Sequence, residues 1–551
     1  MIIFRTNVSS SIGIGHLARC RRLAVSLKSN RYEVCFALDY VNDYLKEYLK
    51  GFTCYGVYSL NESFSEEKDD AMRFFEYFGE KKVIAVVVDD YRFSSIWEEL
   101  ITRLDCKIIV LDDQDKNIHQ CNLLIDSSWE GDKTFQRYKG KVSNNATCLL
   151  GPKYLLIDEL FSTNKKREHK ALNKNQPIRI LLSLGGGGDL IFLISLIKHF
   201  IDKPLNDLNY EITTIIGPYA TNKDEFIVFS KKYDEVKIIL NQDGLFNEIS
   251  KSDLYIGASG GTLFEALAMQ IPCITFSISE NQQNDHVNFE DLGHYFHLNE
   301  ITESDLANFA LLVWEILSQY QRIYNLYQNP STFKIDGKGV ERVCKAIHSV
   351  IIEEPILELG EISKQDEHDL NKGYDLNQIN DTAINRYLDA RNLKINLDKM
   401  IDKNPIPRLN HYLWWLKANK RTSYVLKKNG EELLFIWHQL QKVENKNVII
   451  SGWFISNKSC SALDAMHAVT EHSIFIDNLF PGFSWIIVMR SDNYFMQKLH
   501  QRLDFRMVDK GSDMERVVQK SFPKADPDDF LYYFKRIRYS KLNQHVKPKT
   551  H

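Results

Sequence analysis

The sequence predicts a protein of the α/β class, with two successive domains built on parallel sheets and a C-terminal α+β domain. Short apolar runs alternate with helix-length segments in residues 1–155 and again in 156–353, which is typical of parallel strands covered by helices. After a linker predicted at 354–376, residues 377–551 change to a hairpin pattern mixed with helices. The chain of 551 residues also exceeds the roughly 250–300 residues that one hydrophobic core supports.

The composition is that of a globular protein and excludes several function classes. Hydrophobic residues make up 44% of the chain, which is enough for buried cores. The 69 basic and 73 acidic residues nearly balance, so we expect neither a nucleic acid nor a membrane as partner. The nine cysteines contain no C-x-x-C pair, which argues against a disulfide framework or a zinc site. Without a signal-peptide pattern or an apolar run of ~18 residues, the expected location is the cytoplasm.

In the first domain, apolar runs predict strands at 1–7, 32–40, 83–91, 107–115 and 121–128. Between the first two strands, an apolar stripe at helical spacing runs from Leu17 to Leu27 and predicts a helix. His16 lies outside this stripe, where the first strand leads into the helix. In open parallel sheets ligands bind at the carboxyl ends of the strands, so His16 is either a candidate base or an ordinary turn histidine.

The second domain repeats this pattern, and the third departs from it. Strands are predicted at 178–184, 210–218, 236–240, 253–258 and 272–279, and helical patterns at 304–328 and 337–353. In the third domain we expect helices at 379–392, 406–419 and 494–505, and strands at 447–456 and 483–493. A hairpin is predicted to turn at Asn429 and Gly430.

Three glycine clusters follow predicted strands and precede predicted helices, at 13–15, 183–189 and 257–262. Such a turn exposes backbone N–H groups and the positive end of a helix dipole to an anion, although each cluster could also be a plain tight turn. In the third cluster Glu265 follows one turn into the helix, where it could accept hydrogen bonds from a ribose or be a solvated helix residue.

Asp112 and Asp113 are paired carboxylates at the end of a predicted strand. A glycosidase pair or a metal site is one interpretation. However, neighbouring residues on a strand face opposite ways, which disfavours a shared role.

The stretches "GIGHLARC", "VVVDDY", "LLGPKY", "SLGGGG" and "SGGTLFEALAMQIPCI" with a later "ENQ" resemble the two-domain GT-B enzymes that act on nucleotide sugars. More closely, residues 1–350 resemble the UDP-2,4-diacetamido-2,4,6-trideoxy-β-L-altropyranose hydrolases of pseudaminic acid biosynthesis. The resemblance implies two Rossmann-like domains with a cleft between them, and hydrolysis of a UDP-linked sugar without metal or cofactor.

In that family the histidine of G-x-G-H is catalytic, so the resemblance implies that His16 activates water, with Tyr91 and Asn281 beside the sugar. The family usually carries asparagine near "LLIDSS" (123–128), so the roles of Asp126 and Ser127 stay open. The candidate substrate and UDP contacts are Gly13, Gly15, Arg19, Gly185, Gly186, Gly260, Gly261, Thr262, Glu265 and Gln282.

Three C-terminal stretches, "ARNL" (390–393), "IPRLNHYLWWL" (406–416) and "DNYFMQKLHQRLDF" (492–505), resemble the GNAT acetyltransferases that acetylate UDP-sugars. The resemblance implies acetyl-CoA as cofactor. The matching residues are Arg391, Asn392, His411, Asn493 and His500, of which His500 could protonate the leaving thiolate. The loop expected to bind the coenzyme A pyrophosphate, "SNKSCSALDA" (456–465), contains no glycine, so a degenerate module that binds substrate or assembles the protein is the alternative.

The resemblances together predict a UDP-sugar hydrolase of nonulosonic acid synthesis for surface glycans, fused to a domain that could N-acetylate the same sugar. Its partners would be the UDP-sugar and other enzymes of that sugar pathway. An inverting glycosyltransferase with a non-catalytic third domain is the competing enzyme, and a non-catalytic sugar-nucleotide sensor is the remaining alternative.

Overall fold

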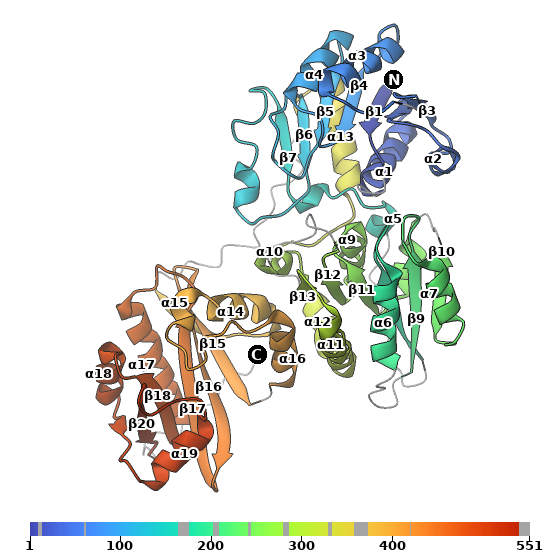
Figure 1. Cartoon of the computed structure of the whole chain (residues 1–551). Helices are drawn as coiled ribbons and strands as arrows, with labels where there is room; N and C mark the ends of the chain where they lie inside the picture. Colours follow the sequence, from blue (N-terminus) through green and yellow to red (C-terminus); the bar gives the residue numbers. More distant parts are fainter. Residues whose placement is uncertain are drawn as a thin grey trace. The chain divides into compact units, whose positions relative to one another are not determined.

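The computed structural model describes residues 1–8, 14–59, 62–163, 176–201, 209–240, 244–278, 286–328, 333–356, 373–418 and 420–538. The chain forms two compact units, Met1–Gln365 and Asp366–His551. Unit 1 contains two parallel sheets and unit 2 a third, mixed sheet (Figure 1). Across the described residues, no helix is both long and apolar enough to cross a membrane.

The first sheet has the strand order β3-β2-β1-β4-β5-β6-β7, with every neighbouring pair parallel. This order is that of a Rossmann-like sheet. Helices α1 and α2 pack on one face, and α3 and α4 on the other. The strands are β1 (Ile2–Thr6), β2 (Val34–Leu38), β3 (Thr53–Gly56), β4 (Ala85–Asp89), β5 (Lys107–Leu111), β6 (Leu123–Asp126) and β7 (Thr147–Leu150). The helices are α1 (Gly15–Ser29), α2 (Asp43–Tyr48), α3 (Glu67–Phe78) and α4 (Ser95–Ile101).

The second sheet is also fully parallel, in the order β10-β9-β8-β11-β12-β13. Its strands are β8 (Ile178–Ser183), β9 (Tyr210–Ile216), β10 (Val236–Leu240), β11 (Leu254–Ala258), β12 (Cys273–Phe276) and β13 (Phe296–Leu298). Its helices are α5 (Leu160–Thr163), α6 (Leu190–Ile201), α7 (Lys223–Ser230), α8 (Phe246–Lys251), α9 (Gly261–Ala268), α10 (His286–Asp291), α11 (Leu306–Ser318) and α12 (Tyr320–Gln328). The pair of Rossmann-like domains expected from the sequence is thus confirmed.

The last helix of unit 1, α13 (Gly339–Ile351), returns to the first sheet although it follows the second in sequence (Figure 1). Val340, Val343 and Ile347 are buried in one core with residues of β1 and α1. The sequence pattern assigns this segment to the second domain, because an amphipathic pattern shows that a helix has a buried face but not which core covers it.

Unit 2 is an α+β domain with the strand order β14-β15-β16-β17-β18-β20-β19. Its strands are β14 (Tyr374–Gln378), β15 (Arg421–Lys428), β16 (Glu431–Val443), β17 (Lys446–Ile455), β18 (Ser484–Arg490), β19 (Arg506–Met507) and β20 (Phe530–Arg536). Its helices are α14 (Ile384–Arg391), α15 (Lys394–Leu397), α16 (Arg408–Lys417), α17 (Ala462–Leu479), α18 (Tyr494–Arg502) and α19 (Asp513–Ser521). Only β17 and β18 pair in parallel, over Val448–Ile450, while the other neighbours are antiparallel.

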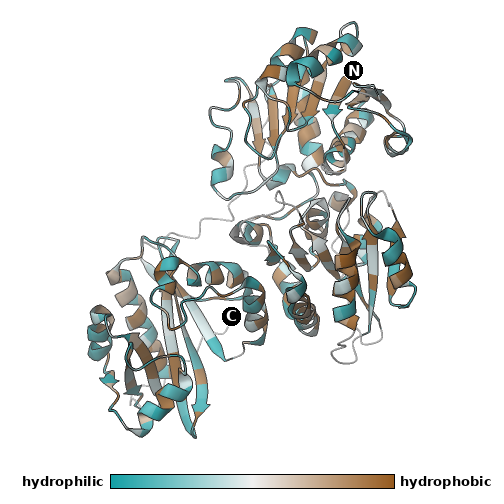
Figure 2. Cartoon of the chain, in the orientation of Figure 1, coloured by the Kyte–Doolittle hydropathy of each residue, from teal (hydrophilic) through white to brown (hydrophobic). Residues whose placement is uncertain are grey.

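The predicted hairpin is confirmed, since Asn429 and Gly430 both have positive φ between β15 and β16, as a type I′ turn requires. The predicted linker at 354–376 overlaps β14 at residues 374–376. The sequence pattern does not predict β3, β7, β13, β14, β19 or β20. Several are short, and β14 carries exposed polar residues, so hydropathy separates them poorly from loops. In Figure 2 the central strands of the first sheet are strongly hydrophobic.

Candidate active site

The candidate catalytic histidine lies where β1 and β4 end side by side. β4 pairs in parallel with β1, with Asp89 opposite Thr6, and α1, the next helix along the chain, begins at Gly15. The predicted apolar stripe of α1 is buried, and His16 lies off it in the first turn. Its Nδ1 is 2.6 Å from Oδ1 of Asp89, whose side chain is fully buried at the end of β4.

The contacts of His16 determine which of its ring nitrogens carries the proton. A carboxylate only accepts hydrogen bonds, so the short contact with Asp89 requires that Nδ1 donates. Nη2 of Arg19 also lies 3.2 Å from Nδ1, but a guanidinium only donates and adds no acceptor there. In the neutral ring Nε2 then carries the lone pair, and no described residue is hydrogen-bonded to it. This is the arrangement of a general base oriented by a carboxylate.

Arg19 holds Asp89 in its charged form. Its Nε donates to Oδ2 of Asp89 at 2.7 Å and its Nη2 to Oδ1 at 2.6 Å, which is a bidentate pair. Burial alone would raise the pKa of Asp89, but the charges and hydrogen bonds of Arg19 and His16 outweigh it and keep this pKa below its ordinary value. Asp89 is thus an anion that can stabilise a protonated His16.

Tyr91 and Asp113 complete the cluster. The Tyr91 ring meets the His16 ring edge-on, with centroids 4.7 Å apart, and its hydroxyl donates to Oδ1 of Asp113. Nη1 of Arg19 donates to Oδ2 of Asp113 at 2.8 Å. Burial and the negative charge of Asp113 raise the pKa of Tyr91, so its hydroxyl stays protonated. The Asp113 side chain is 32% exposed, which leaves it accessible to a polar ligand.

Asp112 faces away from this cluster, as expected for neighbouring residues at a strand end. Its carboxylate accepts from the backbone of Gln114 and from the hydroxyl of Tyr138, and lies near the His119 ring. Burial would lower the pKa of His119, but Asp112 and Glu98 raise it to about 9, so the ring is charged at neutral pH. Asp112 therefore stabilises the fold, while Asp113 belongs to the candidate site.

The two neighbouring carboxylates are expected to differ when each is replaced. Asp113→Asn weakens the hydrogen bonds that the Asp113 carboxylate accepts from Tyr91 and Arg19. It should lower kcat about 10- to 100-fold with an unchanged melting temperature. Asp112→Asn removes a partner of a buried charge and should cost about 1–3 kcal/mol of stability with little loss of kcat. Thermal unfolding and steady-state kinetics on both variants check this, and equal kinetic effects would contradict the assignment.

The third glycine cluster forms a helix N-terminus whose N-cap residue has no capping side chain. Helix α9 begins at Gly261, its N-cap Gly260 makes no side-chain capping bond, and Thr262 follows in the first turn. A Cβ placed on Gly261 would meet no atom within 4 Å, so the backbone there can be approached closely. Free N–H groups at such an end can bind a phosphate.

Glu265 is not a solvated helix residue, because it is only 3% exposed. Its Oε1 accepts from Nη2 of Arg22 on α1 at 2.6 Å, and Arg22 also donates to the carbonyl of Leu156. Burial raises the pKa of Glu265 despite the Arg22 charge. Arg22 was not among the residues singled out from the sequence, where nothing distinguishes it from the neighbouring arginines of α1.

The second cluster packs backbone against backbone. Gly186 and Gly188 accept hydrogen bonds from the N–H groups of Tyr219 and Thr221, and a Cβ on Gly186 would lie 2.9 Å from Ile14. Gly185 has φ +76°, which favours glycine. The Asp189 carboxylate already accepts from Ile191 N–H at the start of α6. Close packing is thus one reason for these glycines, and the contacts of Gly185 and Gly186 with UDP stay a prediction.

Three predicted site residues, Gly13, Asn281 and Gln282, lie outside the described residues. Gly15 is the first residue of α1, and a Cβ there would meet nothing within 4 Å. The fold brings together His16, Arg19 and Tyr91, which the sequence singled out, Tyr91 through the family resemblance. The sequence pattern missed Asp89, although the position of this residue at the end of a buried strand, within "VVVDDY", was an available signal.

In unit 2, three predicted acetyl-transfer residues make structural contacts. Asn392 bonds both backbone groups of Ile406, and Asn493 caps α18 by accepting from Met496 N–H. His411 is buried, and its Nε2 bonds the carbonyl of Ile384. Burial lowers the pKa of His411 to about 3, so its ring is neutral.

The other two predicted residues are also enclosed. Arg391 donates to the carbonyl of Asp402, while its Nη1 is buried without a partner. His500 is 7% exposed, its Nδ1 bonds the carbonyl of Met496, and burial lowers its pKa to about 4. A neutral ring with its N–H already engaged is poorly suited to protonate a thiolate at neutral pH.

The predicted pyrophosphate position lies at the start of α17, which the protein's own carboxylate already occupies. Asp464 accepts from the backbone N–H and hydroxyl of Ser461 at 2.7 and 2.6 Å, and Ser461 Oγ accepts from Asp464 N–H. This capping box is reinforced by the Tyr374 hydroxyl at 2.6 Å and by Lys428. A second anion would meet a fixed negative charge there, so this helix start does not fit a coenzyme A pyrophosphate.

Comparisons with known proteins extend the similarity over almost the whole chain. An uncharacterised protein of Methanocaldococcus jannaschii is 23% identical over 537 residues, covering 93% of this chain and 98% of its own. The spore coat polysaccharide biosynthesis protein SpsG of Bacillus subtilis is 23% identical over 355 residues, covering 62% of this chain and 96% of its own.

Among solved structures, Staphylococcus aureus MnaA with UDP aligns with 13% identity and a TM-score of 0.41, covering 64% of this chain and 98% of its own. No protein-family model matches the sequence.

Proposed function

We propose that unit 1 hydrolyses a UDP-linked diacetamido-trideoxy hexose to the free sugar and UDP. The observation that carries this is the His16–Asp89 pair next to the Tyr91 ring, in which Nε2 of His16 has no hydrogen-bond partner among the described residues. The sequence resemblance supplies the sugar class, and similarity to a polysaccharide biosynthesis protein supports carbohydrate chemistry. The start of α9, which has no capping side chain, supports a diphosphate ligand.

In the proposed reaction, Nε2 of His16 takes a proton from water as the water oxygen bonds to the anomeric carbon. The bond between that carbon and the UDP oxygen breaks, and its electron pair leaves with UDP. Asp89 stabilises the imidazolium that forms, as the carboxylate does in a catalytic triad. In this proposal the N–H groups at the start of α9 stabilise the departing diphosphate.

An inverting glycosyltransferase is the second candidate, because the same base could deprotonate an acceptor hydroxyl. The two are separated by incubating the protein with the UDP-diacetamido sugar and EDTA, without acceptor, and following sugar and UDP by NMR. Hydrolysis predicts stoichiometric release of both, lost in His16→Ala. No free sugar, or equal release by the variant, would overturn the proposal.

For unit 2 we propose a binding or assembly role in place of acetyl transfer, because Asp464 occupies the start of α17. Calorimetric titration with coenzyme A is expected to show no binding, and acetyl-CoA with the 4-amino precursor to release no thiol. Asp464→Asn removes the fixed charge and so tests whether this charge is what excludes coenzyme A. Saturable coenzyme A binding by the wild-type chain would contradict this role.

A further inference from the structure

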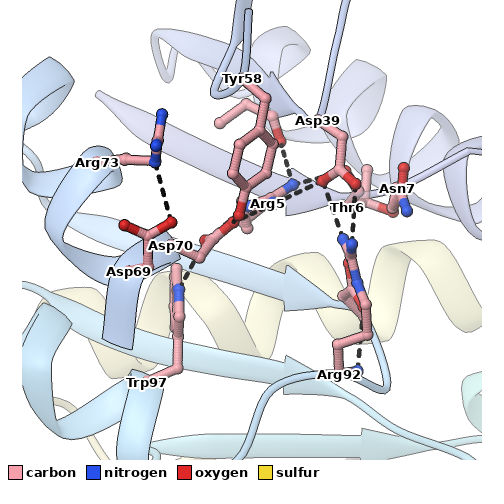
Figure 3. Close-up of polar contacts among 12 residues, drawn as sticks. Arg5, Thr6, Asn7, Asp39, Tyr58, Asp69, Asp70, Arg73, Arg92 and Trp97 are labelled. Atoms are coloured by element: carbon pink, nitrogen blue, oxygen red, sulfur yellow. Dashed lines mark hydrogen bonds and ion pairs between the residues drawn. The ribbon is translucent and has the colours of Figure 1, made fainter. Parts of the chain in front are cut away.

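The loop that carries Tyr91 connects the candidate active site to a buried ion network. Asp89 and Tyr91 contact His16, whereas the alternate residues Asp90 and Arg92 face the other way. Arg92 forms a bidentate ion pair, or fork, with the Asp39 carboxylate. Its Nη1 donates to Oδ2 and its Nη2 to Oδ1, both at 2.9 Å. Figure 3 shows this fork beside Arg5.

The network behind Asp39 is fully enclosed. Arg5 on β1 is 0% exposed and donates to Asp39 at 2.7 Å and to both oxygens of Asp70 on α3 at 3.2 and 2.6 Å (Figure 3). Asp70 also accepts from the Tyr58 hydroxyl at 2.6 Å and from Trp97 Nε1 at 2.8 Å. A buried network whose members are all hydrogen-bonded is rigid, so Asp39 is a fixed anchor.

The short segment between Asp89 and Phe93 is held on several sides. Asp90 Oδ1 accepts from Arg92 N–H at 3.1 Å and from Arg92 Nε at 2.8 Å. Nδ2 of Asn117 donates to the carbonyls of Tyr91 and Phe93. Arg92 is the one described side chain of this segment that bonds to the buried anchor Asp39, and its side chain is 24% exposed, so it can be changed without opening the core.

We propose that Arg92 is a positioning residue that places the Tyr91 hydroxyl beside His16 and Asp113 by tying its loop to the Arg5–Asp39–Asp70 network. This inference rests on the proposed hydrolysis for its kinetic consequence. A guanidinium fork is required because lysine offers a point charge that cannot bond both oxygens of Asp39 in one plane.

The kinetic test is a double-mutant cycle with Arg92→Lys and Tyr91→Phe. Arg92→Lys is expected to lower kcat about 10- to 100-fold with KM changed less than threefold, because a shift of about 1 Å can cost that much. If Arg92 acts through the Tyr91 hydroxyl, Tyr91→Phe/Arg92→Lys will have the kcat of Tyr91→Phe alone. Multiplicative losses would overturn the proposal.

Arg73→Gln is the matched control. Like Arg92, Arg73 pairs with two carboxylates, Asp69 on helix α3 and Glu62 just before that helix. Arg73 does not contact the loop that carries Tyr91. The kcat of this variant is expected to stay within twofold of wild type. Asp90→Asn, which weakens the Arg92 pairing, is expected to reproduce the Arg92→Lys effect and serves if Arg92→Lys folds poorly.

Hydrogen exchange measured by mass spectrometry separates this proposal from the proposed function. Amides of residues 90–94 are expected to exchange at least tenfold faster in Arg92→Lys than in wild type, and unchanged in Arg73→Gln. If wild type does not hydrolyse the UDP-sugar while this exchange result holds, the hydrolase fails and the positioning stands. Unchanged exchange in Arg92→Lys would overturn the positioning.

Discussion

Replacing Asp89 with asparagine is expected to lower kcat by about 10³- to 10⁴-fold, by analogy with loss of the carboxylate in a catalytic triad. The amide can no longer hold the Nδ1–H tautomer of His16 or stabilise its protonated form. Arg19 would also lose the carboxylate to which its Nε and Nη2 donate at 2.7 and 2.6 Å. Single-turnover kinetics with the UDP-sugar measure the chemical step directly.

The control for this variant is Asp69→Asn, which removes a partly exposed carboxylate of α3 that pairs with Arg73. Its kcat should equal that of wild type. UDP affinity, measured by calorimetry, is expected to stay within threefold in Asp89→Asn, because the proposed diphosphate contacts lie on α9. A kcat within tenfold of wild type would show that Asp89 does not orient the base.

Unit 2 is expected to lose stability steeply between pH 6.5 and pH 4. Burial lowers the pKa of His438 and His500 to about 4, and that of His411 and His472 to about 3, from the ordinary 6.5. Below pH 6.5 these histidines bind protons in the unfolded chain but stay neutral in the folded domain. The free energy of unfolding, which is fully present above pH 6.5, therefore falls as the pH drops. Each histidine contributes a loss of about 2 kcal/mol at pH 5.

Hydrogen exchange of the full chain at pH 7.5 and pH 5.0, corrected for intrinsic rates, measures this loss in peptides of unit 2. The ring nitrogens of His438 and His472 lie 3.1 Å apart in the core, so His438→Leu/His472→Leu removes two titrating groups together. Between pH 7.5 and pH 5.0 this variant should lose about half as much free energy of unfolding as the wild type. His467→Leu, which alters a half-buried histidine of α17, should behave as wild type. Equal acid sensitivity in all three proteins would show that the buried neutral histidines do not cause the loss.

Much of the fold could be predicted because most strands of the two parallel sheets are buried on both faces and read as continuous apolar runs. β1, β2, β4, β5 and β6 were all predicted in this way. Short strands such as β13 and β19 were not, because pairing with a neighbour, and not hydropathy, makes them strands. The final core of α13 likewise depends on a return of the chain that no local pattern encodes.

The amino-acid pattern alone was sufficient to place His16 off the buried face of its helix. It also identified the glycine-rich turns as candidate anion sites. It also predicted that Asp112 and Asp113 diverge, because alternation along a strand is a local property. Asp89 as the partner of Nδ1 and Arg22 as the partner of Glu265 emerged only in the folded chain. Asp89 and Glu265 find partners on other elements, where sheet register and helix packing, and not sequence spacing, decide which charges meet. The role of Asp464 was decided instead by the local backbone at a helix start, where its side chain turns back to close a capping box and so excludes a second anion.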